Sequence, residues 1–160
     1  MNTVMVLTSK DLNTFFIEHG CGDWKINQSN LAKCSYLITT ANSNSDWSQH
    51  PKELHGNAFM VAKIIGVFKS NKNPDRLVIE FDKYAHLNLE NAWNGQQNPV
   101  RYVNYEDFDL DLTNLNWLDF PVKEKSKEDN VTPLTIEEAK KGLAKKLGIT
   151  VENIEIIIRT

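Results

Sequence analysis

The chain of 160 residues predicts an α+β protein: a small mixed β-barrel with flanking helices, followed by a C-terminal helix–strand unit. Three observations support this fold class. Apolar runs typical of neighbouring strands occur at residues 36–40, 58–68 and 76–81. A charged segment, Lys123 to Asn130, contains no apolar residue and is typical of a linker. Beyond it, residues 131–160 have the spacing of one helix and one strand.

The barrel is expected to begin with a strand and a short helix. Residues 3–7 are rich in Val and Leu and alternate weakly, which predicts the strand. Thr8 or Ser9 can cap the helix that follows, with Asp11 near its positive end. Residues 20–35 include two glycines and are expected to be irregular.

The central strands come next. Residues 36–40 predict a strand, and residues 41–57 form a long polar loop rich in Asn, Ser and Asp. The run 58–68 is apolar on both alternating faces except at Lys63, which is the profile of a strand covered on both sides. Gly66 within this run indicates a bulge or a sharp bend, as in a small barrel.

The rest of the barrel follows a turn at residues 70–75, after which residues 76–81 return as the partner strand. Residues 84–89 and 99–103 predict two more short strands, with Pro99 confined to the start or the edge of its strand. Residues 104–120 place apolar side chains among acidic ones and predict a turn followed by a short helix.

The C-terminal unit has the clearest local signals. Thr135 and Glu138 have the spacing of a capping box, and Gly148 is a helix stop. Four apolar residues lie at helical spacing between them: Ile136, Ala139, Leu143 and Leu147. Residues 154–158 predict an apolar strand. The expected organisation is therefore a barrel domain over residues 1–121, a charged linker over 122–130 and a helix–strand unit over 131–160.

The overall charge and the cysteines limit the classes of function. The net charge is −3, which argues against a broad phosphate-binding surface and leaves room for a local basic patch. No apolar run approaches the ~20 residues of a membrane helix, so no membrane partner is expected. The N-terminus lacks the basic start of a signal peptide, and Cys21 and Cys34 have no framework spacing. These features predict a cytoplasmic protein with reduced thiols.

The segment around Trp93 concentrates side chains suited to recognition. An Asn-Gly turn pair follows Trp93 and presents it near a loop. Trp93 and Tyr102 can stack a base, Asn98 can bond a base edge, and the planar fork of Arg101 suits a phosphate, a carboxylate or a base edge. In the alternative interpretation, the two aromatic residues plug the end of the β core while Arg101 pairs with a surface carboxylate. The usual role of aromatic side chains in packing favours this alternative.

The polar loop over residues 41–57 is a second candidate. Asn42, Trp47 and His50 can form a polar pocket for a base or another small ligand. The alternative is a solvated loop with one anchoring Trp. Both interpretations stay open, although a long loop that leads into a buried strand is a frequent place for a site.

Metal and catalytic sites have little support. The candidate metal ligands do not have the paired spacings of a structural zinc site: His19, Cys21, Cys34, His50 and His55. The chain contains none of the common nucleophile-elbow, phosphate-loop, dinucleotide or zinc-protease motifs. We therefore predict no catalytic residue, no metal and no cofactor.

Three features together carry a resemblance to a known family. They are the polar loop after Tyr36–Thr40, the strand Phe59–Val67 with its hairpin partner, and the late turn Pro99–Tyr102. Over residues 1–120 this order resembles the PUA-like superfamily, which includes the ASCH and EVE domains. The resemblance implies a small mixed β-barrel with flanking helices, and many members bind RNA or modified DNA bases. Residues 131–160 lie outside the pattern.

Three hypotheses of function follow. The first is a non-catalytic module of the PUA-like type that binds RNA, DNA or a modified base. Its candidate binding residues are Asn42, Trp47, His50, Trp93, Asn98, Arg101 and Tyr102. The second is a protein–protein interaction module, such as one carried by a mobile element, which docks a partner through residues 131–160. The third is a small ASCH-type hydrolase that uses Lys63, because a buried lysine can have a lowered pKa.

Overall fold

The computed structural model describes residues 2–122 and 135–157. The chain divides into two compact units, residues 1–123 and residues 124–160, which are described separately. The predicted linker lies outside the described residues except for Val122, and so does the start of the predicted helix–strand unit at residues 131–134.

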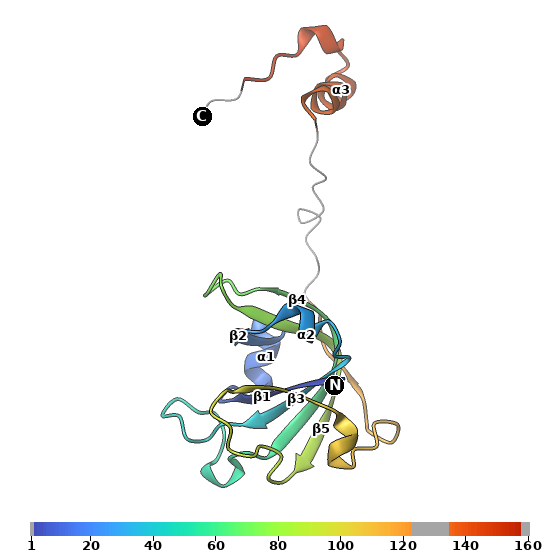
Figure 1. Ribbon diagram of the computed structural model, residues 1–160. Helices are drawn as coiled ribbons and strands as arrows, with labels where there is room; N and C mark the ends of the chain where they lie inside the picture. The colour runs from blue at the N-terminus through green and yellow to red at the C-terminus, as the bar shows by residue number, and fades with distance from the viewer. Residues whose placement is uncertain (1, 123–134, 158–160) are drawn as a thin grey trace. The chain divides into compact units, whose positions relative to one another are not determined.

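The first unit is built on a curled mixed sheet (Figure 1). Within its described residues, six strands follow the order β2-β5-β4-β3-β1-β6, and a short seventh strand, β7, pairs with β5. The strands are β1 (Thr3–Thr8), β2 (Cys21–Trp24), β3 (Tyr36–Ala41), β4 (Ala58–Lys69), β5 (Leu77–Leu89), β6 (Val100–Val103) and β7 (Leu118–Asp119). β1 and β3 are parallel, and the other pairs are antiparallel. The sheet is a half-barrel, since the described strand order ends at β2 and β6 without joining them.

The curl of the sheet comes from the long β4–β5 hairpin. Its register shifts at three places, two of which flank Ile64 and lead to Gly66. A bulge bends its strand and increases the local twist. These shifts therefore bend the hairpin and give the sheet its half-barrel curvature. The irregularity predicted at Gly66 is confirmed.

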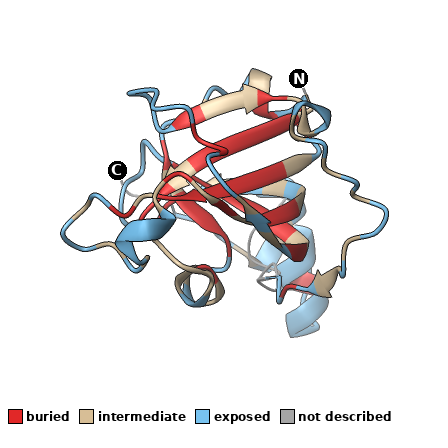
Figure 2. Cartoon of the chain, turned by 90° about the horizontal axis from the view of Figure 1, so that it is seen from below, coloured by how far each residue is buried: buried red, intermediate tan, exposed pale blue. Residues whose placement is uncertain are grey.

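The two faces of the sheet carry separate cores. Along β1, Val4 and Val6 point to one face and Met5 to the other, because successive side chains alternate in a strand. The helix-side core contains Val4 and Val6 and is completed by Phe15 and Leu31 from the two helices. The loop-side core contains Met5 and is covered by the chain between residues 105 and 117. Figure 2 shows buried residues running along the central strands.

The first helix, α1 (Leu12–Glu18), starts two or three positions later than expected. Asp11, not Thr8 or Ser9, is its N-cap, and the Asp11 carboxylate accepts a hydrogen bond from the backbone N–H of Thr14 at 2.9 Å. The backbone N–H groups in the first turn of a helix have no partner within the helix, so an acceptor at the N-cap stabilises the helix. The predicted cap was wrong, although the helix itself is confirmed.

Residues 20–35 are more regular than expected. They contain β2 and the short helix α2 (Gln28–Leu31). β2 has no alternating pattern of its own and is held by pairing with Leu77 and Ile79 of β5. This pairing is long-range in sequence, so local patterns did not reveal it.

The short helix predicted within residues 104–120 is also wrong. That stretch contains a single 3₁₀ turn, η2 (Tyr105–Phe108), followed by irregular chain and β7. The two short strands predicted at residues 84–89 and 99–103 are present, the first as the continuation of β5 and the second as β6.

The polar loop over residues 42–57 is tied to the rest of the first unit. It contains one 3₁₀ turn, η1 (Lys52–Leu54). The His50 ring packs against Phe59, and its Nε2 donates a hydrogen bond to the backbone carbonyl of Lys10 at 3.0 Å. Burial lowers the pKa of His50, and its hydrogen bond to Lys10 and the nearby Asp11 charge only partly oppose this. His50 therefore anchors the loop as a neutral imidazole.

The second unit contains the predicted helix, α3 (Ile136–Leu147), and a 3₁₀ turn, η4 (Val151–Asn153). Thr135 and Glu138 form the expected capping box, and Gly148 ends the helix in the left-handed conformation. The strand expected at residues 154–158 is wrong for its described part, because residues 154–157 pair with no other strand. Residue 158 lies outside the described chain. Within the described residues, no helix has the length and apolarity needed to cross a bilayer.

We expect Asp11→Ala to destabilise the first unit by about 1 kcal/mol, because the N–H of Thr14 loses its acceptor. Urea unfolding followed by circular dichroism measures this change. Asp46→Ala, at an exposed loop position, is the matched control and should leave the midpoint unchanged. Equal midpoints for the two variants would contradict the capping role.

We expect acid to weaken the fold partly through His50. Its folded pKa is lowered, so below the unfolded value of about 6.5 the unfolded chain binds a proton that the folded chain does not. Stability therefore falls as the pH drops through this window. In His50→Gln the unfolding free energy should depend less on pH between about 7 and 5 than it does in the wild-type protein. Identical pH profiles for the two proteins would remove His50 from this role.

Candidate functional site

A hollow of about 440 Å³ lies at one edge of the half-barrel, and we call it the edge hollow. One wall comes from the carboxyl end of β1, from Asn42 directly after β3, and from Pro99 directly before β6. The opposite wall comes from β2 and from the β4–β5 turn, including Asn73 and Arg76. The carboxyl ends of parallel strands meet at the same edge of a sheet, which is why residues far apart in sequence converge here.

The edge hollow combines an aromatic surface with cations and amides. Trp47 lies at its rim with 66% of its surface exposed, whereas Trp24 in the opposite wall is buried. Arg76 donates one hydrogen bond to the backbone carbonyl of Asp23 at 3.0 Å, which leaves most of its donors available. Asn42 and Asn73 add side-chain amides from the two walls. This set can stack a flat ring and bond both a polar ring edge and an anion.

The loop that carries Trp47 is held at both of its ends. On one side, the backbone N–H of Asn42 donates to the carbonyl of Thr8 at 2.8 Å. On the other side, the N–H of Gln49 donates to the carbonyl of Ser9 at 2.9 Å, next to the His50 anchor. Both ties run to the carboxyl end of β1, at Thr8 and Ser9, so the rim of the edge hollow is fixed to the strand end that forms one of its walls.

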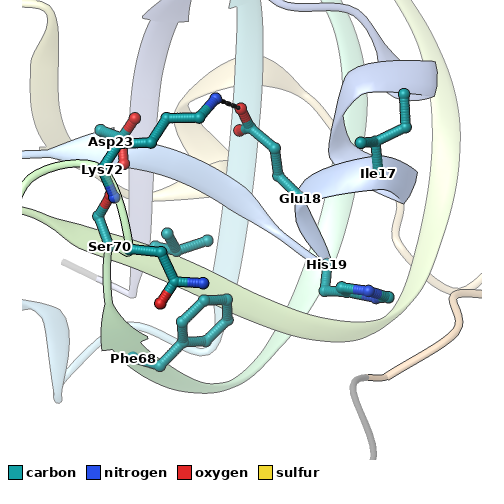
Figure 3. Close-up of a pocket in the computed structure, with 9 residues that line it drawn as sticks. Ile17, Glu18, His19, Asp23, Phe68, Ser70 and Lys72 are labelled. Carbon is teal, nitrogen blue, oxygen red and sulfur yellow. Dashed lines mark hydrogen bonds and ion pairs between the residues drawn. The ribbon is translucent and has the colours of Figure 1, made fainter.

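A second cavity of about 240 Å³ adjoins the edge hollow and shares Asp23 with it (Figure 3). It lies between the end of α1 and the β4–β5 turn and has apolar walls that include Phe68 and Val78. Figure 3 shows Lys72 of the turn reaching toward Glu18 of α1, and their charged atoms lie 2.9 Å apart. An ion pair therefore closes one side of this cavity.

Of the predicted residues, Asn42 and Trp47 line the edge hollow. His50 lies behind the rim as the loop anchor. Asn98 is exposed beside Pro99, and its side-chain oxygen accepts a hydrogen bond from the N–H of Val100 at 3.2 Å. Asn98 thus orders the start of β6, next to the wall that Pro99 forms.

Trp93 and Arg101 lie together, but away from the edge hollow. Trp93 is 7% exposed and belongs to the loop-side core. The guanidinium carbon of Arg101 lies 5.5 Å from the centroid of a Trp93 ring, a cation–π arrangement. The Trp93 Nε1 is buried and has no hydrogen-bond partner among the described residues.

Tyr102 lies on the opposite face of β6 from Arg101, because neighbouring side chains alternate along a strand. It packs against the helix-side core, and its hydroxyl donates to the backbone carbonyl of Asn27 at 3.2 Å. Burial raises the pKa of this hydroxyl. The predicted grouping of Trp93, Arg101 and Tyr102 is therefore split between two faces of the sheet.

Lys10, Arg76 and Asn73 were missed by the sequence analysis. Lys10 follows β1, and the other two lie in a turn that looks like an ordinary hairpin connection in the sequence. Their placement in one hollow depends on the order of the strands, which local patterns do not reveal. An Arg next to an Asn-Pro-Asp turn was the one available signal.

Lys63, the residue of the hydrolase hypothesis, lies on the loop-side face. Its amino group is 4.6 Å from the centroid of a Trp117 ring, so a cation–π contact accounts for its position. Within residues 2–122 and 135–157, no three side chains of His, Cys, Asp or Glu are grouped as metal ligands would be. Both cysteines are free and buried, and burial raises the pKa of Cys21 to about 12.

No family model, no curated protein and no solved structure matches the chain.

Proposed function

We propose that the first unit is a PUA-like module that binds an unpaired nucleotide of RNA or DNA in the edge hollow, without catalysis. The observation that carries this proposal is the exposed Trp47, held at the rim of a hollow that also contains Arg76 and Asn42. The mixed half-barrel with its flanking helices is compatible with the PUA-like resemblance of residues 1–120.

The aromatic side chain supplies most of the expected affinity. A tryptophan with two-thirds of its surface in water is unfavourable unless another group covers it, and a nucleobase has the flat apolar face to do so. Stacking on an aromatic side chain contributes ~1–3 kcal/mol per base. The loop ties hold the backbone on both sides of Trp47 before a ligand arrives, so little ordering of the backbone is required on binding.

The polar groups of the walls match the rest of a nucleotide. Asn42 and Asn73 can donate to and accept from a base edge, and the Arg76 fork suits a phosphate. A volume of about 440 Å³ falls within the usual range for small-ligand sites. It accommodates one nucleotide and is far too small for a duplex.

The net charge also favours a single unpaired nucleotide over a long backbone. Proteins that follow a nucleic-acid backbone carry an extended basic surface, whereas this chain has a net charge of −3. Binding should therefore depend on one extruded or single-stranded base, and a modified base is a natural variant of such a ligand.

The second candidate function is protein–protein interaction through the second unit. The observation that favours it is the exposure of large apolar side chains on α3: Ile136 is 54% exposed, Leu143 43% and Leu147 64%. These residues lie at helical spacing and form a stripe of the kind that docks into a partner's groove. Deletion of residues 131–160 separates the two functions. Full retention of nucleic-acid binding by residues 1–130 would confine that activity to the first unit.

We expect Trp47→Ala to weaken binding to a short single-stranded oligonucleotide by roughly 5- to 150-fold, the loss of one stacked base. Fluorescence anisotropy with labelled RNA and DNA, single-stranded and duplex, measures the affinity at two salt concentrations. Ile17→Ala is the matched control, because Ile17 is 79% exposed but lies outside the edge hollow.

The same titration locates the site. Arg101→Ala should leave the affinity unchanged, since Arg101 packs over Trp93 on the loop-side face. A loss confined to Arg101→Ala would move the site to the Trp93–Arg101 pair. The absence of binding by the wild-type protein at low salt would contradict the proposal itself.

A further inference from the structure

Four charged side chains form a continuous network beside the edge hollow. The Lys10 Nζ lies 2.6 Å from one carboxylate oxygen of Glu18 and 3.6 Å from the Asp23 carboxylate. The other Glu18 oxygen lies 2.9 Å from the Lys72 Nζ. Three of these side chains are largely buried, with exposures of 16% for Lys10, 15% for Glu18 and 18% for Asp23. Their charges are therefore only weakly screened by solvent.

Glu18 joins two segments that form different walls of the edge hollow. Lys10 belongs to the segment after β1, whereas Lys72 belongs to the β4–β5 turn that also carries Asn73 and Arg76. One carboxylate thus holds the two segments together from the end of α1. Asp23 makes a second connection, because its carboxylate faces Lys10 while its backbone carbonyl accepts a hydrogen bond from Arg76.

The network decides which cation can meet a ligand. Lys10 lines the edge hollow, but its charge is matched by two carboxylates. Lys72 shares Glu18 and lines the adjoining cavity instead. Arg76 is different, because no carboxylate of the described residues lies close enough to its guanidinium group to form an ion pair. It is the uncompensated cation of the edge hollow.

We infer that the edge hollow takes a single phosphate charge, at Arg76, and that Glu18 is a positioning residue which keeps Lys10 from acting as a second phosphate ligand. The inference rests on the proposed function of the hollow and narrows it. The ligand is one nucleotide whose single phosphodiester meets Arg76, while Glu18 fixes the separation of the two walls around it. Among the described residues that line the hollow, a ligand with two adjacent phosphates finds no second available cation.

The salt dependence of oligonucleotide binding tests the inference. Each phosphate contact contributes a slope of about −0.7 to log K against log salt for single strands. The wild-type protein should give about −0.7, and Arg76→Gln should bring the slope near zero with weaker binding at low salt. Glu18→Gln removes the nearer of the two carboxylates that face Lys10 and leaves only Asp23, at 3.6 Å, so it should steepen the slope toward about −1.4. A purely structural role for Glu18 would weaken binding without steepening the slope.

Lys72→Met is the matched control. Like Arg76→Gln, this variant removes one positive charge. Lys72 lines the adjoining cavity and not the edge hollow, so its charge should not meet the ligand. Its slope should remain about −0.7. Inorganic phosphate in excess should compete only weakly with the oligonucleotide, because a free phosphate lacks the stacked base. Competition as strong as that of a mononucleotide would make the site a phosphate site and overturn the inference.

The outcomes separate the inference from the proposed function. A wild-type protein that binds, together with a Glu18→Gln slope equal to that of the wild type, overturns the role of Glu18 and leaves the proposed function standing. A wild-type slope of about −1.4 or steeper overturns the single-phosphate assignment. No wild-type binding at low salt overturns both proposals.

A second measurement keeps the role of Glu18 testable if Glu18→Gln folds poorly. A double-mutant cycle of Glu18→Gln and Lys10→Met, read as shifts in the urea midpoint, reports the coupling of the two side chains. We expect non-additive shifts, with the double variant more stable than the sum of the single variants predicts. Additive shifts would show that the two charges are not coupled and would overturn the positioning role.

Discussion

The parallel pairing of β1 with β3 is the constraint on which the rest of the first unit depends. Six consecutive residues of β1 pair with residues 36–41, without a shift in register. Two adjacent parallel strands cannot be joined by a tight turn, so the chain must cross from one end of the sheet to the other. The crossover contains α1, β2 and α2. This single pairing therefore places the helices, brings β2 to the far end of the sheet and sets the carboxyl ends of two strands side by side at the edge hollow.

The sequence predicted the parts of the fold whose signals are local. The central strands, the bulge near Gly66 and the capped helix α3 each have their pattern within a few residues, and each is present. β2 was missed because its four residues gain their partners from β5, more than fifty positions away in the sequence. The strand expected after Asn153 was wrong for the opposite reason. An apolar, β-branched stretch has the propensity for a strand, but a strand also needs a neighbour to pair with.

The residues of the candidate site also divide into those with a local signal in the sequence and those that depend on the order of the strands. Asn42 and Trp47 could be predicted, because a long polar loop is visible in the sequence and they line the edge hollow. Lys10, Asn73 and Arg76 could not be predicted, since only the strand order brings the two walls together. Arg101 and Tyr102, which were grouped in the sequence, lie on opposite faces of the sheet. Adjacent residues of a strand face opposite sides of its sheet, so a cluster in the sequence becomes two separate environments in space.

The ties of the Trp47 loop have a kinetic consequence. Asn42 and Gln49 are hydrogen-bonded to the backbone at the carboxyl end of β1, and His50 packs against Phe59. A rim that is already in place requires no slow rearrangement before a ligand docks, so association should follow a single concentration-dependent phase. Differences in affinity between ligands would then reside in how long each one stays. If the edge hollow binds a nucleotide as proposed, the lifetime of the complex is the quantity that distinguishes one ligand from another.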